Sequence, residues 1–293
     1  MDTYKKRNRI LKNEQDVFKE NSWDNTEWDE EQLNSAKNMV QSNSQFLISQ
    51  NLCELYKNEG NEYWNKFYMK HGVNFFQNRN WLLDEFEELR ICHNANQDAR
   101  IFEFGCGVGN TILPLVSEYI KSNLASKIEF YASDYSSVAI EHLKKNNKYN
   151  QTHLKTFVYD MTSTEEILSV EFNSMDIIII IFVLSSIEPK KHKIAITNAV
   201  KYLKKGGVLL FRDYGRYDLA QLRFKPGTCI EDNFYVRGDG TTVYFFTKED
   251  VENIFKECGL VKKSLIYDKR LNVNRQRKLK MYRVWIIGTY QKI

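Results

Sequence analysis

Short apolar stretches alternate with helical patterns from residue 100 onward. The apolar stretches lie near 100–104, 127–133, 154–159, 175–183 and 207–213. Between them, apolar residues recur at the spacing of amphipathic helices over 110–121, 136–146, 190–204 and 247–258. Strands that alternate with helices predict a parallel sheet with right-handed crossovers and with helices on both of its faces.

The pattern changes after the fifth apolar stretch. NFYVRGDGTTVYFF has two β-rich runs on either side of the turn signal GDG, which predicts a β-hairpin inside an insertion at 215–246. Two more apolar runs, 261–268 and 281–290, predict a final antiparallel pair of strands. We interpret LKKGG at 203–207 as a helix that ends on glycine before a strand. The sequence therefore predicts an α/β fold with a seven-stranded, mostly parallel, Rossmann-like sheet.

The first hundred residues are organised differently from the rest. Residues 1–55 are rich in Asn, Gln, Ser and charged side chains, which predicts a partly flexible region with one helix within 31–55. Aromatic residues are concentrated in 63–86, where their spacing predicts two helices joined by a loop near Gly72. The predicted divisions are a polar region 1–55, an aromatic-rich helical cap 56–95 and a main α/β domain 96–293.

The segment IFEFGCGVGN, residues 101–110, is the clearest candidate for a cofactor loop. An apolar strand ends at Glu103, and three alternating glycines precede the next helix, which is the layout of a nucleotide-type cofactor loop. Glycines suit such a loop because a Cβ would clash where a cofactor lies against the backbone. Asn110 replaces the last glycine of a dinucleotide fingerprint, and the absence of a following GK[ST] excludes a P-loop.

Asp134 ends the second predicted strand, where its carboxylate could hold a ribose diol. A cofactor with a ribose but no pyrophosphate fits these residues best, and S-adenosylmethionine answers that description. The alternative is a tight strand-to-helix turn that binds no ligand. For Asp134 itself, the alternative is a cap on the helix that begins near Ser136.

Charge and cysteine content limit the partners and the compartment. The net charge is only +4, but the last thirty or so residues are basic, which suggests phosphate contacts or, alternatively, a solvated face. The five cysteines, Cys92 among them, form no CxxC pair and indicate neither a zinc site nor disulfides. We therefore expect no metal and a reducing compartment, the cytoplasm. The most apolar run, 175–184, is too short to span a bilayer, so no membrane contact is expected.

Six longer motifs occur in the order expected of one family: WNKFYMKHGVNFFQNRNWLLDEF, EFGCGVGNTILPL, ASDYSSVAIEHLKKN, IIFVLSSIEPKK, LLFRDYGRYDLAQLRF and NFYVRGDGTTVYFFT. Over roughly residues 60–290 the chain resembles the tRNA N3-methylcytidine methyltransferases of the methyltransferase-like group. The resemblance implies a class I methyltransferase fold, S-adenosylmethionine as cofactor, and methylation of cytidine thirty-two in the anticodon loop of threonine, serine or arginine tRNAs. Some members act with a seryl-tRNA synthetase or another protein partner. Residues 1–55 carry no such match.

The resemblance and the strand ends together predict a cofactor site. Asp160 and Met161 would lie beside the adenine, although Asp160 could instead cap the turn at Thr162. Ile181 and Phe182 lie at the end of the fourth strand and at the ligand crevice, where an apolar strand end is equally ordinary core. Glu103 could reach the amino end of the cofactor through water or form a buried ion pair. The predicted cofactor-binding residues are Trp64, Tyr68, Glu103, Gly105, Gly107, Asn110, Asp134, Asp160, Met161 and Ile181.

Trp64 and Tyr68 lie one helical turn apart in the aromatic block. Aromatic residues at that spacing are more often part of a core than of a lid. Only the resemblance, in which the block folds over the cofactor, supports a cofactor role for them. His71, Arg79 and Trp81 in the same block are further candidates.

The end of the fifth strand carries the predicted catalytic residues Arg212, Asp213 and Tyr214. Asp213 could accept a hydrogen bond from the cytosine amino group and offset the positive charge that arises when N3 is methylated. Tyr214 could stack on the base. The alternative is an Arg212–Asp213 pair that holds the strand end. The predicted RNA-binding residues are Arg223, Lys225, Arg237, Arg275, Arg277 and Lys278.

The predicted reaction is direct attack of cytosine N3 on the sulfonium methyl of the cofactor. N3 of neutral cytosine already carries a lone pair, so no general base is required, and orientation supplies most of the rate. Because N3 lies on the Watson–Crick edge, the base must be unpaired and held by stacking. Two alternatives stay open: a small-molecule or protein methyltransferase, which would not need the basic residues, and a non-catalytic RNA-binding pseudoenzyme, which would not need Asp134 and Asp160.

Overall fold

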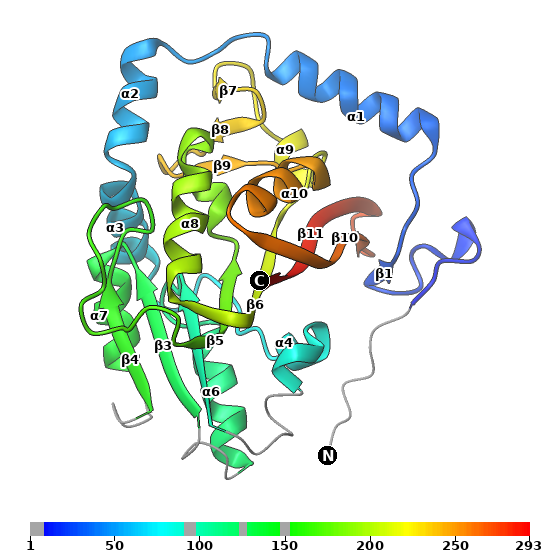
Figure 1. Cartoon of the computed structure of the whole chain (residues 1–293). Coiled ribbons are helices and arrows are strands. Elements are labelled where there is room, and N and C mark those ends of the chain that lie inside the picture. Colours follow the sequence, from blue (N-terminus) through cyan, green and yellow to red (C-terminus); the bar gives the residue numbers. More distant parts are fainter. Residues whose placement is uncertain (1–8, 91–97, 123–127, 147–152) are drawn as a thin grey trace.

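The computed structural model describes residues 9–90, 98–122, 128–146 and 153–293. Its centre is an eight-stranded sheet with the order β1-β10-β11-β6-β5-β2-β3-β4 (Figure 1). This arrangement confirms the predicted α/β class and the mostly parallel sheet. The five parallel strands are β2 (Ala99–Phe104), β3 (Ile128–Asp134), β4 (Leu154–Val158), β5 (Met175–Ile181) and β6 (Leu203–Tyr214).

Three further strands complete one side of the sheet. β11 (Leu279–Lys292) lies antiparallel to β6, and β10 (Leu260–Asn274) lies antiparallel to β11, which is the predicted final pair. β1 (Ser22–Asp24) then pairs with residues 270–272 of β10. The predicted number of seven strands is therefore wrong. β1 has only three residues, which are too few to show a strand period in the sequence. They become a strand only in the folded chain, where they pair with the free edge of β10.

Helices cover both faces of the sheet because alternate strand residues point to opposite sides. Phe102 and Ile178 face a core that includes residues of α8 and α10. Ile101 and Ile177 face a second core that includes residues of α6 and α7. Burial on both faces explains why β5 is apolar without a break from Ile177 to Ile181. The four helices are α6 (Ile112–Lys121), α7 (Ser137–Asn146), α8 (His192–Tyr202) and α10 (Lys248–Glu257).

The aromatic block forms the predicted helical segment, although its second helix is short. The first helix ends at His71, and the next residue, Gly72, has φ +54°, a left-handed conformation that glycine adopts readily. Phe67 and Tyr68 of this helix pack against Ala139 of α7. Residues 31–55 contain parts of two helices rather than one. The N-terminal helices are α1 (Glu30–Asn43), α2 (Gln50–Asn58), α3 (Gly60–His71) and α4 (Leu82–Glu85).

Residues 9–28, which the sequence predicts to be flexible, pack against the end of the sheet instead. A short 3-10 helix, η1 (Glu14–Asp16), precedes β1. Val17 and Trp23 are buried against Leu271 and Val273 of β10, and the Trp23 indole donates a hydrogen bond to the Val17 carbonyl (2.8 Å). The partners lie at the opposite end of the chain, so the local sequence gives no sign of this packing.

The insertion after β6 forms a small separate sheet. β8 (Phe234–Val236) and β9 (Thr242–Tyr244) are the predicted hairpin, and β7 (Cys229–Glu231) adds a third antiparallel strand. The interpretation of LKKGG as a helix end is wrong. β6 begins directly after α8, and these residues lie where the pairing of β5 with β6 shifts register. The remaining short elements are η2 (Leu184–Ser186), η3 (Pro189–Lys191) and α9 (Leu219–Leu222).

The parallel strands place their carboxyl ends along one edge, where ligands bind in open sheets of this kind. β11 pairs with β6 only as far as Trp285, which lies opposite Tyr214 at the end of β6. β10 and β11 continue their own pairing to Asn274 and Leu279. The β10–β11 hairpin therefore projects beyond the carboxyl edge of the sheet.

Candidate active site

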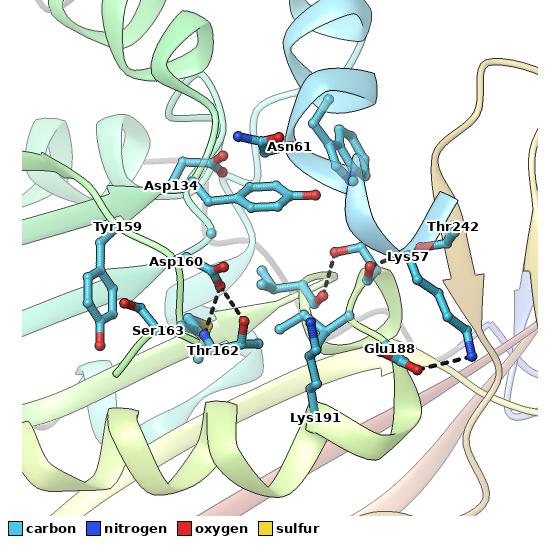
Figure 2. A pocket seen from close by; sticks show the side chains of 18 of the residues that line it. Lys57, Asn61, Asp134, Tyr159, Asp160, Thr162, Ser163, Glu188, Lys191 and Thr242 are labelled. Atoms are coloured by element: carbon cyan, nitrogen blue, oxygen red, sulfur yellow. Dashed lines mark hydrogen bonds and ion pairs between the residues drawn. The ribbon is translucent and has the colours of Figure 1, made fainter. Parts of the chain in front are cut away.

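A cavity of about 500 Å³ opens at the carboxyl edge of the parallel strands; we call it the edge cavity. Figure 2 shows its side chains converging from α2 and α3 (Lys57, Asn61), from the end of β3 (Asp134) and from the loop after β4 (Asp160). The predicted cofactor-binding residues that line it are Trp64, Tyr68, Gly105, Asp134, Asp160 and Met161. Four others lie outside its lining: Glu103, Gly107, Asn110 and Ile181.

The glycine loop presents bare backbone to its surroundings. Gly105 and Gly107 have φ of +65° and +54°. A Cβ at Gly105 would collide with the side chain of Val183, and one at Gly107 would collide with the hydroxyl of Tyr68. The predicted need for glycine therefore rests on both backbone conformation and close approach.

Asp134 lies at the end of β3 and is only 7% exposed. Its Oδ2 accepts a hydrogen bond from the Gly107 amide (2.8 Å), and its Oδ1 accepts one from the Ser136 amide (2.9 Å). Burial raises the pKa of Asp134 to about 6, and the two amide hydrogen bonds partly oppose that rise. The hydroxyl of Ser136 caps α7 by accepting from the Ala139 amide (3.1 Å). Each carboxylate oxygen has more than one acceptor position, so Asp134 can still accept from ligand hydroxyls.

Asp160 combines the two roles that the sequence left open. Its Oδ1 accepts hydrogen bonds from the amide (2.8 Å) and the hydroxyl (2.9 Å) of Thr162, so it does stabilise the turn. Both of these bonds use one oxygen, and the exposed carboxylate also lines the edge cavity. Met161 is buried beside it, and its carbonyl accepts from the amide group of Asn198 (2.8 Å).

Glu103 is buried behind the glycine loop and is 1% exposed. Its Oε2 has no hydrogen-bond partner among the described residues. Burial raises the pKa of Glu103 to about 7, while the Arg79 cation and the Thr111 hydroxyl lower it in part. Arg79 itself donates to the Thr111 hydroxyl (2.6 Å) rather than forming an ion pair with Glu103. The loop is thus backed by an acid with an unused acceptor.

Asn110 and Ile181 have contacts other than those predicted. The amide group of Asn110 donates to the Phe76 carbonyl (2.9 Å) and to Asn78 Oδ1 (3.1 Å), which ties the glycine loop to the segment after α3. Ile181 is buried in the core on the α6 and α7 face. The next residue, Phe182, lines the cavity instead, with a left-handed φ of +58°. The sequence placed Phe182 at the ligand crevice together with Ile181, but an apolar run gives no sign of the left-handed conformation at Phe182.

The cap helices contribute both core and cavity surface. The rings of Trp64 and Tyr68 lie 5.8 Å apart, and both side chains also line the edge cavity. Lys57 of α2 reaches across to Glu188 (3.0 Å) and to Glu231 (3.6 Å), as the dashed contact to Glu188 in Figure 2 shows. This ion pair, which the sequence did not predict, fastens α2 to the loop after β5.

Arg212 does not reach the edge cavity. Its guanidinium lies 2.6 Å from Asp268 and 3.6 Å from Glu85. It is stacked 5.0 Å from the Trp81 ring and 4.8 Å from the Trp285 ring. Residues 212 and 213 alternate on β6 and point to opposite faces. The proposed Arg212–Asp213 pair is therefore wrong, because Arg212 pairs with acids of other elements.

Asp213 is fully buried and lies outside the cavity lining. Its Oδ2 accepts from the Ser185 amide (2.9 Å), and its Oδ1 accepts from the Tyr214 amide (2.8 Å). Burial raises the pKa of Asp213 to about 6, against these hydrogen bonds and the nearby Arg237 cation. The geometry lets Asp213 fix the η2 turn and the start of the segment after β6.

Tyr214 belongs to a pair of rings that lies between two cations at the carboxyl edge. Its ring lies 5.1 Å from that of Phe182, which lines the cavity. Arg79 lies 5.4 Å from the Phe182 ring, and Arg237 lies 5.9 Å from the Tyr214 ring. Sequence analysis predicted Tyr214 and Arg237 separately, and only the fold brings them together.

The other predicted RNA-binding residues lie at two exposed places. Arg223 and Lys225 follow α9. Arg275, Arg277 and Lys278 lie at the turn of the β10–β11 hairpin, beyond the carboxyl edge, where Lys278 also lies 4.7 Å from the Phe18 ring.

The residues of the edge cavity fit S-adenosylmethionine. The cavity has the size typical of cofactor sites, the glycine loop offers bare backbone, and Asp134 can accept from ribose hydroxyls. The unused acceptor of Glu103 suits a cationic amino end. Among residues 9–90, 98–122, 128–146 and 153–293, no group of three or more His, Cys, Asp or Glu could hold a metal ion, and no helix is long and apolar enough to cross a membrane. The four described cysteines are free, and Cys92 lies outside the described residues.

This fold, with its strand order and glycine loop, defines a class I methyltransferase. Residues 102–209 match the model of the methyltransferase domain. A solved SAM-dependent methyltransferase from Methanosarcina mazei has the same fold, with a TM-score of 0.52 and 16% identity over 74% of this chain and 99% of that protein.

Relatives of known activity specify the class further. The tRNA N(3)-methylcytidine methyltransferase Mettl2 of Drosophila melanogaster is 46% identical over 97% of this chain and 87% of that protein. The tRNA N(3)-cytidine methyltransferase METTL2 of Danio rerio is 42% identical over 97% of this chain and 88% of that protein. The chain belongs to the family of tRNA N3-cytidine methyltransferases, as its motifs predicted.

Proposed function

We propose that this protein transfers a methyl group from S-adenosylmethionine to N3 of cytidine thirty-two in the anticodon loop of tRNA. The single observation that carries the proposal is the edge cavity, where the cofactor-type glycine loop and Asp134 lie beside the Phe182–Tyr214 ring pair. Membership of the tRNA N3-cytidine methyltransferase family supports the same acceptor. It disfavours a small-molecule or protein substrate and a pseudoenzyme.

The cofactor would be held by residues of the loop, the strand ends and the cap. Asp134 would accept from the ribose hydroxyls, Asp160 from the adenine amino group, and Trp64 and Tyr68 would close the site from α3. When bound, S-adenosylmethionine supplies an electrophilic methyl on a sulfonium. Four acids, Asp134, Asp160, Glu165 and Glu188, outnumber the two lysines of the lining, Lys57 and Lys191, and favour a ligand with a positive centre.

The cofactor would supply its methyl to the lone pair of cytosine N3, with its sulfonium becoming a neutral thioether and the positive charge passing to the base. No residue would have to remove a proton first. The protein is therefore required to position the base and to exclude water. A buried carboxylate close to the acceptor end, Asp213, would offset the charge on the methylated base.

The unpaired base would be held by stacking. Phe182 and Tyr214 offer aromatic surface, and the flanking Arg79 and Arg237 offer cations to the phosphates on either side. In this proposal Tyr214 touches the base, Asp213 positions Tyr214 and η2, and Arg212 supports β6 from the opposite face.

The tRNA stem would extend along the projecting β10–β11 hairpin. Arg275, Arg277 and Lys278 at its turn, with Arg223 and Lys225, are proposed to contact phosphates. Threonine, serine or arginine tRNAs as acceptors and a seryl-tRNA synthetase as partner stay predictions from the family resemblance. The cytoplasm stays the predicted place of action, from the cysteine usage.

The test is to incubate the purified chain with S-adenosylmethionine and unmodified tRNA pools and to measure modified nucleosides by mass spectrometry. We expect new 3-methylcytidine, and sequencing of the product should place it at position thirty-two. A methylated base other than 3-methylcytidine would contradict the proposal. So would the absence of product when the cofactor binds and a cell extract, as a source of partner proteins and prior modifications, is added.

A further inference from the structure

A second cavity, of about 260 Å³, lies at the root of the β10–β11 hairpin; we call it the hairpin cavity. Four separate parts of the chain form it: the segment from β1 into α1, the residues after β6, the start of α10 and the hairpin itself (Figure 1). Its lining consists of Trp28, Leu33, Arg216, Tyr217, Thr247, Tyr267, Lys269 and Val284.

The lining has the composition of a site for an anion with an aromatic part. Trp28, Tyr217 and Tyr267 offer three rings, and Arg216 and Lys269 offer two positive charges. None of the lining residues is a carboxylate. Rings beside cations are the combination that binds single-stranded nucleic acid, because each base stacks and each phosphate carries a negative charge.

Two side chains of this lining have buried donors that nothing satisfies. The Trp28 indole Nε1 and the Arg216 Nε have no hydrogen-bond partner among the described residues. A buried donor without an acceptor is costly, and few occur in a native fold. Oxygen acceptors, such as those of a phosphate or a base carbonyl, are the partners that these donors lack.

The backbone conformation of Tyr217 also indicates that the hairpin cavity binds a ligand. Tyr217 has φ +67°, a left-handed conformation that bulky side chains rarely adopt. Its amide is held by Gln221 Oε1 (2.7 Å), and Asp218 fastens the same turn to β11 through Arg283 (2.8 Å). Strain maintained by such a network is typical of residues placed for binding.

The hairpin cavity is a close neighbour of the edge cavity. Phe182 of the edge cavity contacts Tyr214, and Arg216 of the hairpin cavity follows Tyr214 by two residues. The segment 242–247 also connects the two cavities, because Thr242 lines the edge cavity and Thr247 lines the hairpin cavity. Five extended residues span at most about 17 Å, which a few nucleotides of one RNA loop can bridge.

We propose that the hairpin cavity binds a second unpaired nucleotide of the same tRNA whose cytidine enters the edge cavity. The base lies against Trp28 and the two tyrosines, and the phosphate lies near Arg216 and Lys269. The inference rests on the proposed function, because its ligand is part of the tRNA substrate. A free mononucleotide has the same chemistry, and the experiment below separates the two sources.

The first test measures tRNA affinity of the Arg216→Gln/Lys269→Gln double variant. We expect the dissociation constant for tRNA to rise about tenfold or more and the salt dependence of binding to fall by roughly 1 to 2 in slope. Cofactor affinity should stay unchanged, which also reports that the variant is folded. The matched control is Lys263→Gln, an exposed lysine of the same strand, which should change tRNA affinity far less. Equal losses in the control and in Lys269→Gln alone would overturn the proposal.

The second test addresses the stacked base. Trp28→Leu should weaken tRNA binding about fivefold or more, and Trp28→Phe, which keeps a ring, should restore most of it. Adenosine and cytidine monophosphates should bind the wild-type protein only weakly and should not displace tRNA. A different outcome would assign the cavity to free nucleotides and refute the proposal. In that outcome Trp28→Leu abolishes mononucleotide binding but leaves tRNA affinity unchanged. If wild-type protein binds the cofactor but neither binds nor methylates tRNA, the proposed function itself fails instead.

Discussion

The edge cavity and the hairpin cavity lie at the same end of the sheet but carry opposite chemistry. The edge cavity has four acids against two lysines in its lining, and the unused acceptor of Glu103 lies behind its glycine loop. The hairpin cavity has two cations, three rings and two unused donors. An acid-rich pocket suits a cationic cofactor with hydroxyl donors, and a cationic aromatic pocket suits a segment of RNA. The contrast teaches that one sheet edge can bind two charged ligands at separate places, because each site carries the charge opposite to that of its ligand.

The largest effect on only one of the two cavities is expected from Asp134→Ala. The variant loses the buried carboxylate that would accept two ribose hydroxyls, so cofactor affinity should fall roughly 100-fold or more. Binding of tRNA through the hairpin cavity should remain. Isothermal calorimetry with the cofactor and filter binding with tRNA would measure the two effects. Unchanged cofactor affinity would contradict the assignment of Asp134.

The buried acid behind the loop makes a prediction about pH. Because the folded-state pKa of Glu103 is raised to about 7 from the ordinary 4.5, the native state holds a proton that the unfolded chain releases. The stability of the cofactor-free protein should therefore fall as pH rises from about 4.5 to about 7. Asp134 and Asp213, whose pKa values are raised to about 6, contribute a fall of their own. Glu103→Gln should therefore remove only the part due to Glu103, with a gain of about 3 kcal/mol at pH 8 and little gain at pH 4.5.

Urea unfolding at the two pH values, without cofactor, would measure this difference. Asp98→Asn, near the start of β2, is a control that removes a carboxylate outside both cavities. If Glu103→Gln and the parent chain show parallel stability across this range, Glu103 is not a buried titrating acid.

Tyr214 lies between the two cavities, so its variants separate base stacking from cofactor binding. Tyr214→Ala should lower turnover on tRNA roughly 10- to 100-fold, because one stacked base contributes about 1–3 kcal/mol. Tyr214→Phe should keep most of the activity, since the ring remains. Single-turnover kinetics with saturating cofactor would show the effect. A large loss in the phenylalanine variant would mean that the hydroxyl, not the stack, is what matters.

The smallest expected effect concerns the ion pair that fastens α2 over the edge cavity. Lys57→Gln removes the contacts to Glu188 and Glu231, and a partly exposed ion pair contributes on the order of 1 kcal/mol or less. Cofactor affinity should fall about twofold to fivefold, with tRNA affinity unchanged. Binding titrations at low and high salt would test it, because added salt should shrink the difference between variant and parent.

The sequence predicted residues whose roles follow from local pattern. The apolar runs predicted β2 to β6 within a few residues, and the pattern is clearest in β5, which is buried on both faces. The glycine loop and Asp134 were predicted for the same reason: a tight turn against bare backbone requires glycine, and a strand end at the ligand edge can carry an acid. The division at residues 55 and 95 stays a prediction, and β1 shows that the first region contributes to the main sheet.

Other features were decided only by the tertiary structure, because they depend on contacts between distant segments. The motif residues 212–214 are adjacent in sequence, yet strand alternation sends Arg212 into a pair with Asp268 and leaves Asp213 beside Ser185. Trp28 has no periodic context in sequence, and it gains a role only where the N-terminal segment meets the β10–β11 hairpin. The sequence alone thus determined the fold class, the family and the cofactor loop, since these rest on local order along the chain. The tertiary structure decided which side chains share a cavity, since that depends on which face each residue occupies and on what packs against it.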